Sequence, residues 1–331
     1  YLCHFHVDSN MDVEKEIYLI DLHRAQLRTF VPTRWASKDI GGLFHSAMGF
    51  KLNERDFYRF IKTYFNCSLK EALETHSKFI RTSRDRAFRM FMKPILREID
   101  ISFSETQKDT PGYSGRKEDN LRWVAKKKYL SKGLEEIISQ IDSYMEKGEI
   151  IKDEEGHKII RINLKEDIFV IKKYKIKGSW HYLRKLFSQT RAFVAWKASH
   201  WFNAAGIRTI NIVAVIEKYN FLSTTDSYLI SLNQPEERLD KVDLNKQQGY
   251  LIENRLSSFF KRLEWIGFNH GDAKSANFFF GNNNLIVSDL DVSKRRYFQF
   301  IQKNKLSKDK KRILKSFEDN LKIKNSLLRR L

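Results

Sequence analysis

The sequence predicts an α+β protein whose second half forms a small β-rich lobe followed by a helical lobe. Strand patterns come first in that half and helical patterns later, with a polar joint at residues 232–242. The 331 residues are 41% apolar and 13% aromatic, which is enough to bury sizeable cores. The most polar and turn-rich segment, residues 102–118, separates this half from a helical first part.

These observations predict two domains. We expect a first domain over residues 1–105, a linker over 106–120 and a second domain over 121–331. Within the second domain, the small lobe covers about 145–235 and the large lobe about 240–331.

The first domain begins with strand patterns and continues with helical ones. Residues 1–23 resemble two short strands around a polar turn at 8–16. Apolar residues then recur at helical spacing in four segments, which are residues 37–48, 54–65, 68–80 and 83–97.

The second domain alternates strand and helix signals in a definite order. A hairpin around 153–156 and a third strand at 167–175 come first, followed by a helix from about His181 to Ala205 that ends at Gly206. The remaining predicted elements, in chain order, are strands at 210–217 and 227–232, a long helix at 244–265, a loop at 269–277, two strands that turn at 282–284, and a helical tail.

Charge and cysteine content limit the classes of partner. Lys and Arg number 61 and Asp and Glu 41, so the net charge of +20 favours polyanions such as nucleic acid, anionic lipid headgroups or phosphorylated glycans. Cys3 and Cys67 are the only cysteines, which indicates a reducing compartment and argues against a cysteine-based metal site.

No apolar stretch approaches the roughly 18–20 residues that span a bilayer, so we expect no transmembrane segment. The chain begins at Tyr1 without an initiator Met, so this residue need not be the natural start.

The residues that indicate chemistry lie between 268 and 291. Asp272 and Asn277 stand five positions apart in a loop, and Asp289 follows an apolar strand. Phosphoryl transfer needs hard oxygen ligands for Mg²⁺ and a separate carboxylate that receives or orients the attacking hydroxyl. We expect Asp272 to be that carboxylate, Asn277 and Asp289 to hold the metal, and Lys274 to offset the developing charge.

A lysine on the third strand of the small lobe completes this set. Residues 169–172, Phe-Val-Ile-Lys, place Lys172 about a hundred positions before Asp272, and Lys173 would face the opposite side of the strand. Simpler explanations stay open, because His-Gly-Asp is often a solvated turn and Asp289 can merely cap a strand.

Residues of about 145–331 resemble the lipopolysaccharide core kinase family. These are bacterial enzymes of protein-kinase-like fold that phosphorylate Kdo or heptose sugars. The resemblance rests on 170–174 (Val-Ile-Lys-Lys-Tyr), 176–184 (Ile-Lys-Gly-Ser-Trp-His-Tyr-Leu-Arg), 204–209 (Ala-Ala-Gly-Ile-Arg-Thr), 270–272 (His-Gly-Asp) and 288–291 (Ser-Asp-Leu-Asp). It implies a bilobal protein-kinase-like domain that uses ATP and Mg²⁺. It also implies a lipopolysaccharide core or lipid A-Kdo acceptor, and a cytoplasmic location with peripheral contact to the inner face of the inner membrane.

Two departures from protein kinases keep other functions open. The first hairpin has a single glycine, Gly156, and the helix around 190–196 has no glutamate to pair with Lys172. These departures support a pseudokinase or membrane-associated adaptor as the alternative. Another small-molecule kinase of the aminoglycoside or choline type shares His-Gly-Asp and is a third hypothesis.

The first domain resembles the end of a heptose kinase in the same family. The similar segments are residues 1–5 (Tyr-Leu-Cys-His-Phe), 18–28 and 31–40. The resemblance places His4 where the catalytic-loop Asn stands and implies that Asp21 is a metal ligand of a remnant site, in a truncated C-terminal lobe. Pairing of Asp21 with a nearby arginine is the alternative, and a zinc site at the N-terminal histidines lacks a fourth ligand at metal spacing.

The C-terminal segment is strongly basic. Residues 292–331 hold 14 Lys and Arg against 3 Asp and Glu, a charge of +11. Apolar residues recur there at roughly helical spacing, namely Ile313, Leu314, Phe317, Leu321, Ile323 and Leu328. The basic face is either an ordinary solvated surface or a contact to anionic lipid or phosphorylated glycolipid. We expect no nucleic-acid partner, since no recognition motif accompanies the charge. The cluster at 172–185, which mixes cations with aromatic residues, is left unassigned.

Overall fold

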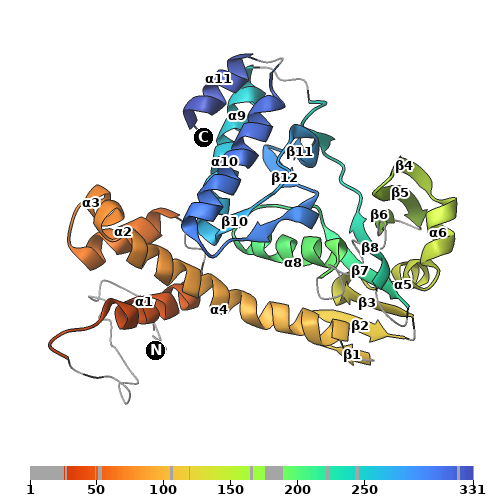
Figure 1. The fold of residues 1–331 in the computed structure, drawn as a ribbon, viewed down its shortest axis with the longest axis horizontal. Coiled ribbons are helices and arrows are strands. Elements are labelled where there is room, and N and C mark those ends of the chain that lie inside the picture. The colour runs from red at the N-terminus through yellow and green to blue at the C-terminus, as the bar shows by residue number, and fades with distance from the viewer. Residues whose placement is uncertain are drawn as a thin grey trace, which may run out of the picture. The chain divides into compact units, whose positions relative to one another are not determined.

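The computed structural model divides the chain into two compact units, Tyr1–Phe91 and Met92–Leu331, which we treat separately (Figure 1). The described residues are 26, 28–48, 50, 54–104, 107–118, 120–164, 167–175, 189–220, 224–242, 246–318 and 321–330. Among them, no helix combines the length and apolar character needed to cross a membrane.

The described part of the first unit is helical. Its elements are α1 (Thr33–Ala47), α2 (Glu54–Phe65), α3 (Leu69–Thr75) and the first part of α4 (Ser77–Ser104). The predicted helices at 37–48 and 54–65 correspond to α1 and α2. The strands predicted within residues 1–23 lie outside the described residues.

Helix α4 differs from the prediction of two helices at 68–80 and 83–97. The break lies at His76, and α4 then runs continuously for 28 residues. Ile80, Ser83 and Ala87 are all buried, so the side of α4 that faces the core continues across the stretch predicted as a break. Ser68 begins α3 by accepting a hydrogen bond from the backbone N–H of Glu71 (3.2 Å).

The second unit is built on an antiparallel sheet of eight strands in the order β1-β2-β3-β7-β8-β6-β5-β4. The strands are β1 (Gln107–Asp109), β2 (Tyr113–Lys117), β3 (Leu121–Lys126), β4 (Glu149–Glu154), β5 (His157–Leu164), β6 (Asp167–Lys175), β7 (Ile212–Tyr219) and β8 (Thr224–Leu232). The predicted hairpin at 153–156 and the strand at 167–175 are therefore present.

The segment predicted as a linker, 106–120, contains strands β1 and β2 of this sheet. Strand β2 lacks large apolar residues at its centre because the backbone of α4 approaches it closely. A Cβ atom on Gly115 would stand 1.9 Å from the carbonyl oxygen of Ser102. The compact units also divide within α4, and not at the segment predicted as the boundary. The assignment of residues 1–105 to a truncated kinase lobe remains a proposal.

Helices pack against the sheet and form an apolar core with it. Helices α5 (Lys132–Ser139) and α6 (Ile141–Lys147) pack against residues of β5 and β6, including Phe169 and Ile171, in one apolar cluster. Helix α8 (Arg191–Ala204) begins after Thr190, whose hydroxyl accepts the N–H of Phe193 (3.3 Å). The predicted single helix from His181 to Ala205 is wrong at its start, because Gln189 and Thr190 are not helical and α8 begins at Arg191; His181 itself lies outside the described residues. The predicted end is confirmed, since Gly206 has a φ of +71° and leaves room for the Arg262 side chain.

The C-terminal part of the second unit is mainly helical, as predicted. Helices α9 (Lys246–Ile266), α10 (Gln299–Lys315) and α11 (Leu321–Arg330) lie side by side (Figure 1). The short strand β9 (Glu237–Arg238) precedes α9. The short elements between α9 and α10 are β10 (Phe268–Asn269), η3 (Ser275–Asn277), β11 (Phe278–Gly281), β12 (Asn284–Val287), η4 (Leu290–Val292) and β13 (Lys294–Arg295). The α+β class is thus confirmed.

The predicted apolar face of the tail is only partly correct. Ile313 and Phe317 are buried, but Leu328 is 55% exposed and its neighbour Leu327 is buried in its place. Helix α10 ends at Lys315, residues 316–318 form a turn, and α11 begins at Leu321. The apolar residues of α10 and α11 therefore do not follow one continuous helical periodicity.

Candidate functional site

The loop that carries Asp272 is held from two sides. It runs between β10 and β11, where Gly271 has a φ of +92°. The carboxylate of Asp309 on α10, with 1% of its side chain exposed, accepts the Gly271 N–H at 3.1 and 3.0 Å. On the other side, the buried His270 ring lies 3.0 Å from the carbonyl oxygen of Ser288. These contacts fix the loop against α10 and the segment that follows β12.

The His270 ring is neutral in this setting. Its Nδ1 accepts the N–H of Asp272 (3.2 Å), which leaves Nε2 to donate to Ser288. Complete burial is the largest influence on its pKa and lowers it, although nearby carboxylates act in the opposite direction. Neither His270 nor Asp309 was predicted to have a role. The His-Gly-Asp motif contained a signal for the first, whereas nothing in the spacing indicated the second.

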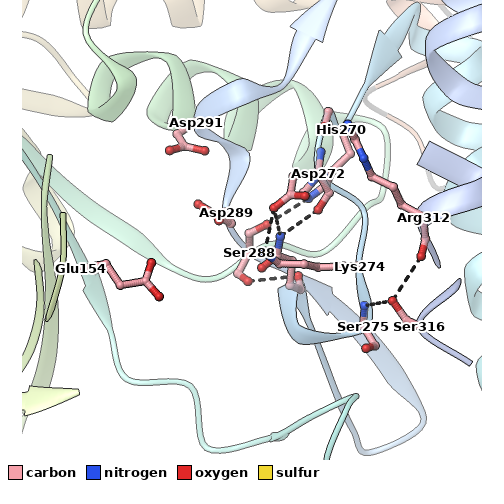
Figure 2. Close-up of polar contacts among 12 residues, drawn as sticks. Glu154, His270, Asp272, Lys274, Ser275, Ser288, Asp289, Asp291, Arg312 and Ser316 are labelled. Carbon is pink, nitrogen blue, oxygen red and sulfur yellow. Dashed lines mark hydrogen bonds and ion pairs between the residues drawn. The ribbon is translucent and has the colours of Figure 1, made fainter. Parts of the chain in front are cut away.

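Three of the predicted residues, Asp272, Lys274 and Asn277, contact one another within this loop, and Figure 2 shows Asp272 and Lys274. The Asn277 amide nitrogen donates to the Asp272 Oδ2 atom (3.0 Å) and to the Asp272 carbonyl oxygen (2.7 Å). The Lys274 Nζ atom lies 3.2 Å from the same Oδ2. The amide donor and the ammonium group hold the Asp272 carboxylate in one orientation, as a group that positions an attacking hydroxyl requires.

The lysine predicted on the small lobe also reaches this region. Lys172 on β6 forms an ion pair with Asp289, whose backbone lies in the left-handed region at φ 56°. Burial is the largest single influence and would raise the pKa of Asp289. The charge of Lys172, the hydrogen bonds from Lys172 and Asp291, and the nearby His270 together outweigh it and hold the pKa below its ordinary value. Lys173 contacts Asp226 on β8 instead (3.2 Å). The structure therefore separates the two lysines as the strand alternation predicted.

A second carboxylate, Asp291, was present in the quoted Ser-Asp-Leu-Asp motif but was given no role. Its side chain is 2% exposed and forms an ion pair with Arg191 of α8. Its Oδ2 atom also lies 3.9 Å from the Lys172 Nζ. Burial first, and then the neighbouring Asp289, raise the pKa of Asp291 to about 6.

The tip of hairpin β4–β5 carries acidic residues at the position where protein kinases have a glycine-rich loop over the nucleotide phosphates. Figure 2 shows Glu154 pointing toward the space beside Asp289. Its carboxylate lies 2.8 Å from Lys152, which is the main reason that the pKa of Glu154 is lowered. Asp153 is paired with Lys175 (3.1 Å). Lysines thus partly balance the negative charge of this tip.

The donor set suits a magnesium ion bound together with a nucleotide. Asn277 and Asp289 supply hard oxygen atoms, and the backbone N–H of Ser288, next to Asp289, donates to the Asn277 carbonyl oxygen (2.9 Å). Mg²⁺ is usually held by one or two protein oxygens and by substrate phosphates. The described residues contain no cluster of three or more His, Cys, Asp or Glu that would form an all-protein cage. Asp21, the predicted remnant ligand, lies outside the described residues.

Comparison with known proteins finds similar sequences for the beginning of the chain. Residues 1–64 match the lipopolysaccharide kinase (Kdo/WaaP) family. This segment is related to the lipopolysaccharide kinases. The lipopolysaccharide core heptose(I) kinase WaaP of Escherichia coli is 40% identical over 102 residues, which are 30% of this chain and 38% of that protein. WaaP of Pseudomonas aeruginosa is 36% identical over 94 residues, which are 28% of this chain and 35% of that protein.

The chain thus spans little more than a third of the curated WaaP proteins that it matches. Among solved structures, WaaP in complex with acyl carrier protein aligns with 61% of this chain and 88% of that chain, at a TM-score of 0.44 and 16% identity.

Proposed function

We propose that residues 121–331 form an ATP-dependent kinase domain that phosphorylates a sugar hydroxyl, Kdo or heptose, of the lipopolysaccharide inner core. One observation carries the proposal. A strand lysine, Lys172, pairs with Asp289, while Asp272 and Asn277 are hydrogen-bonded in the loop that is linked to Asp289 through Ser288. This is the residue set that phosphoryl transfer requires.

Each residue has a distinct task in this reaction. Asp272 orients the sugar hydroxyl and accepts its proton as the hydroxyl oxygen bonds to the γ-phosphorus and the bond to the ADP oxygen breaks. Lys274, beside Asp272, offsets the charge that develops on the transferred group. Lys172 binds the nucleotide phosphates. Asn277 and Asp289 would hold Mg²⁺, which neutralises phosphate charge when it is bound.

The relatedness of residues 1–64 to the lipopolysaccharide kinases supports the proposed acceptor and location. Their substrate is a membrane glycolipid, so we propose that the protein works peripherally at the inner face of the inner membrane. The excess of lysine and arginine in residues 292–331 suits an anionic, phosphorylated surface. We further propose that residues 1–105 derive from the C-terminal lobe of a heptose kinase.

An acceptor screen tests this function. The full chain is incubated with γ-labelled ATP and Mg²⁺, and with Kdo-lipid A, a heptose-containing core, an aminoglycoside or choline in parallel. We expect label only on a core sugar, and its loss in Lys172→Met. Label on the aminoglycoside or choline would contradict the proposed acceptor.

The acidic hairpin tip supports a second candidate, a pseudokinase that binds nucleotide without transfer. Glu154 faces the site, where its charge would repel nucleotide phosphates (Figure 2). Thermal stabilisation by Mg-ATP without label on any acceptor would favour this candidate over the kinase.

A further inference from the structure

Helix α8 lacks the acidic residue that would normally steady a phosphate-binding lysine. Its 14 residues include no Asp or Glu, and its first residue is Arg191. A cation at a helix N-terminus is unfavourable, because the first turn already carries partial positive charge. The position of Arg191 therefore calls for a compensating anion.

Asp291 supplies that anion, and it faces Lys172 as well. Arg191 pairs with the Asp291 Oδ2 atom, and the Lys172 Nζ lies 3.9 Å from the same atom. Both cations also approach the ring of Tyr174, at 4.9 Å for Lys172 and 5.0 Å for Arg191. A carboxylate with 2% of its side chain exposed is tolerated as an ion only with such partners.

The start of α8 is fixed independently of this cluster. Thr190 donates to the buried carboxylate of Glu217 on β7, and Arg122 on β3 binds the other oxygen of Glu217 (2.8 Å). Arg191 is thus presented to Asp291 from an anchored helix end. Segment η4, which contains Asp291, also packs against α8.

We propose that Asp291 is a positioning residue that takes the place of the glutamate missing from α8. Arg191 links α8 to Asp291, and Asp291 holds Lys172 in place when Asp289 binds the metal. This proposal rests on the proposed kinase function for its consequence, but its geometry does not depend on that function. Asp289 has two assigned partners, Lys172 and the metal. Asp291 also lies beside Asp289, but both of its ion-pair partners, Arg191 and Lys172, remain in the protein.

The first test measures the acylation rate of Lys172 by mass spectrometry in the full chain, without metal or nucleotide. In the Asp289→Asn background, Lys172 depends on Asp291 alone. We expect Asp291→Asn in that background to raise the acylation rate roughly tenfold or more, as the loss of a charge-assisted contact implies. Asp226→Asn is the matched control, because it removes the partner of Lys173 on the opposite face and should change only the labelling of Lys173.

The second test uses steady-state kinetics of the otherwise unaltered chain. Asp291→Asn and Arg191→Ala should each raise KM for ATP roughly tenfold and leave KM for the sugar acceptor unchanged. Arg191→Lys should restore much of the ATP affinity, which general damage to the fold would not allow.

Two outcomes separate this inference from the proposed function. Unchanged Lys172 acylation in the double variant would overturn the role of Asp291, whether or not the protein transfers phosphate. Faster acylation together with no transfer by the unaltered chain would support the role of Asp291 and count against the kinase function.

Discussion

Asp309 should hold the loop that carries Asp272 in place. Its carboxylate accepts the Gly271 N–H with both oxygens and lies 3.3 Å from the Arg312 guanidinium. A hydrogen bond to a charged group contributes about 1.5–3 kcal/mol, and a neutral one about 0.5–1.5 kcal/mol. Asp309→Asn keeps one oxygen acceptor and loses the charge, so we expect a cost of about 1–2 kcal/mol. Asp309→Ala removes both and should cost about 3 kcal/mol.

Hydrogen exchange of the peptide over residues 268–274 measures this effect locally. Each 1.36 kcal/mol corresponds to a tenfold change in the opening equilibrium, so Asp309→Asn should speed exchange about tenfold and Asp309→Ala about a hundredfold. Arg312→Gln should have a smaller effect, because the Arg312 side chain is 49% exposed, although it also donates to the Gly271 carbonyl oxygen. Unchanged exchange in the loop of Asp309→Ala would refute the anchoring role.

Two further predictions concern backbone strain and pH. Gly271→Ala should lower the free energy of unfolding by about 1–3 kcal/mol in chemical denaturation. A Cβ at this position would stand 2.8 Å from the Val292 carbonyl oxygen, and the φ of Gly271 is +92°. Gly42→Ala is the control and should not destabilise the protein, because a Cβ on Gly42 has open space around it. Burial, aided by Lys126, lowers the pKa of His200 from 6.5 to about 3, so the unfolded chain binds a proton below pH 6.5 that the folded chain does not. Stability should fall by up to about 2 kcal/mol from pH 7 to pH 5, and an equally steep fall in His200→Gln would exclude this cause.

The sequence predicted the parts of the site that depend on local motifs. Lys172 follows from an alternating strand, and Asp272, Asn277 and Asp289 from one loop and the strand after it. The Val-Ile-Lys pattern favoured Lys172, and strand alternation predicted that Lys173 would face the opposite side. In the structure Lys172 pairs with Asp289 and Lys173 pairs with Asp226.

The missed features depend on contacts between distant segments. Asp309 bonds to Gly271 across 38 positions, and Arg191 meets Asp291 from another helix. Periodicity does not predict such pairs, since each partner alone resembles an ordinary surface charge. Strand β2 was missed for another reason. Its Gly115 is required by close approach to α4, so the segment has the small, polar composition of a linker.

The central claim is that Asp272 acts with Lys172, Asn277 and Asp289 on one nucleotide. The most direct measurement is transfer of labelled γ-phosphate from Mg-ATP to a lipopolysaccharide core acceptor by the unaltered chain and by Asp272→Asn. For Asp272→Asn we expect kcat to fall about 10²–10⁴-fold, with unchanged thermal stabilisation by Mg-ATP. Transfer by Asp272→Asn at the rate of the unaltered chain would contradict it.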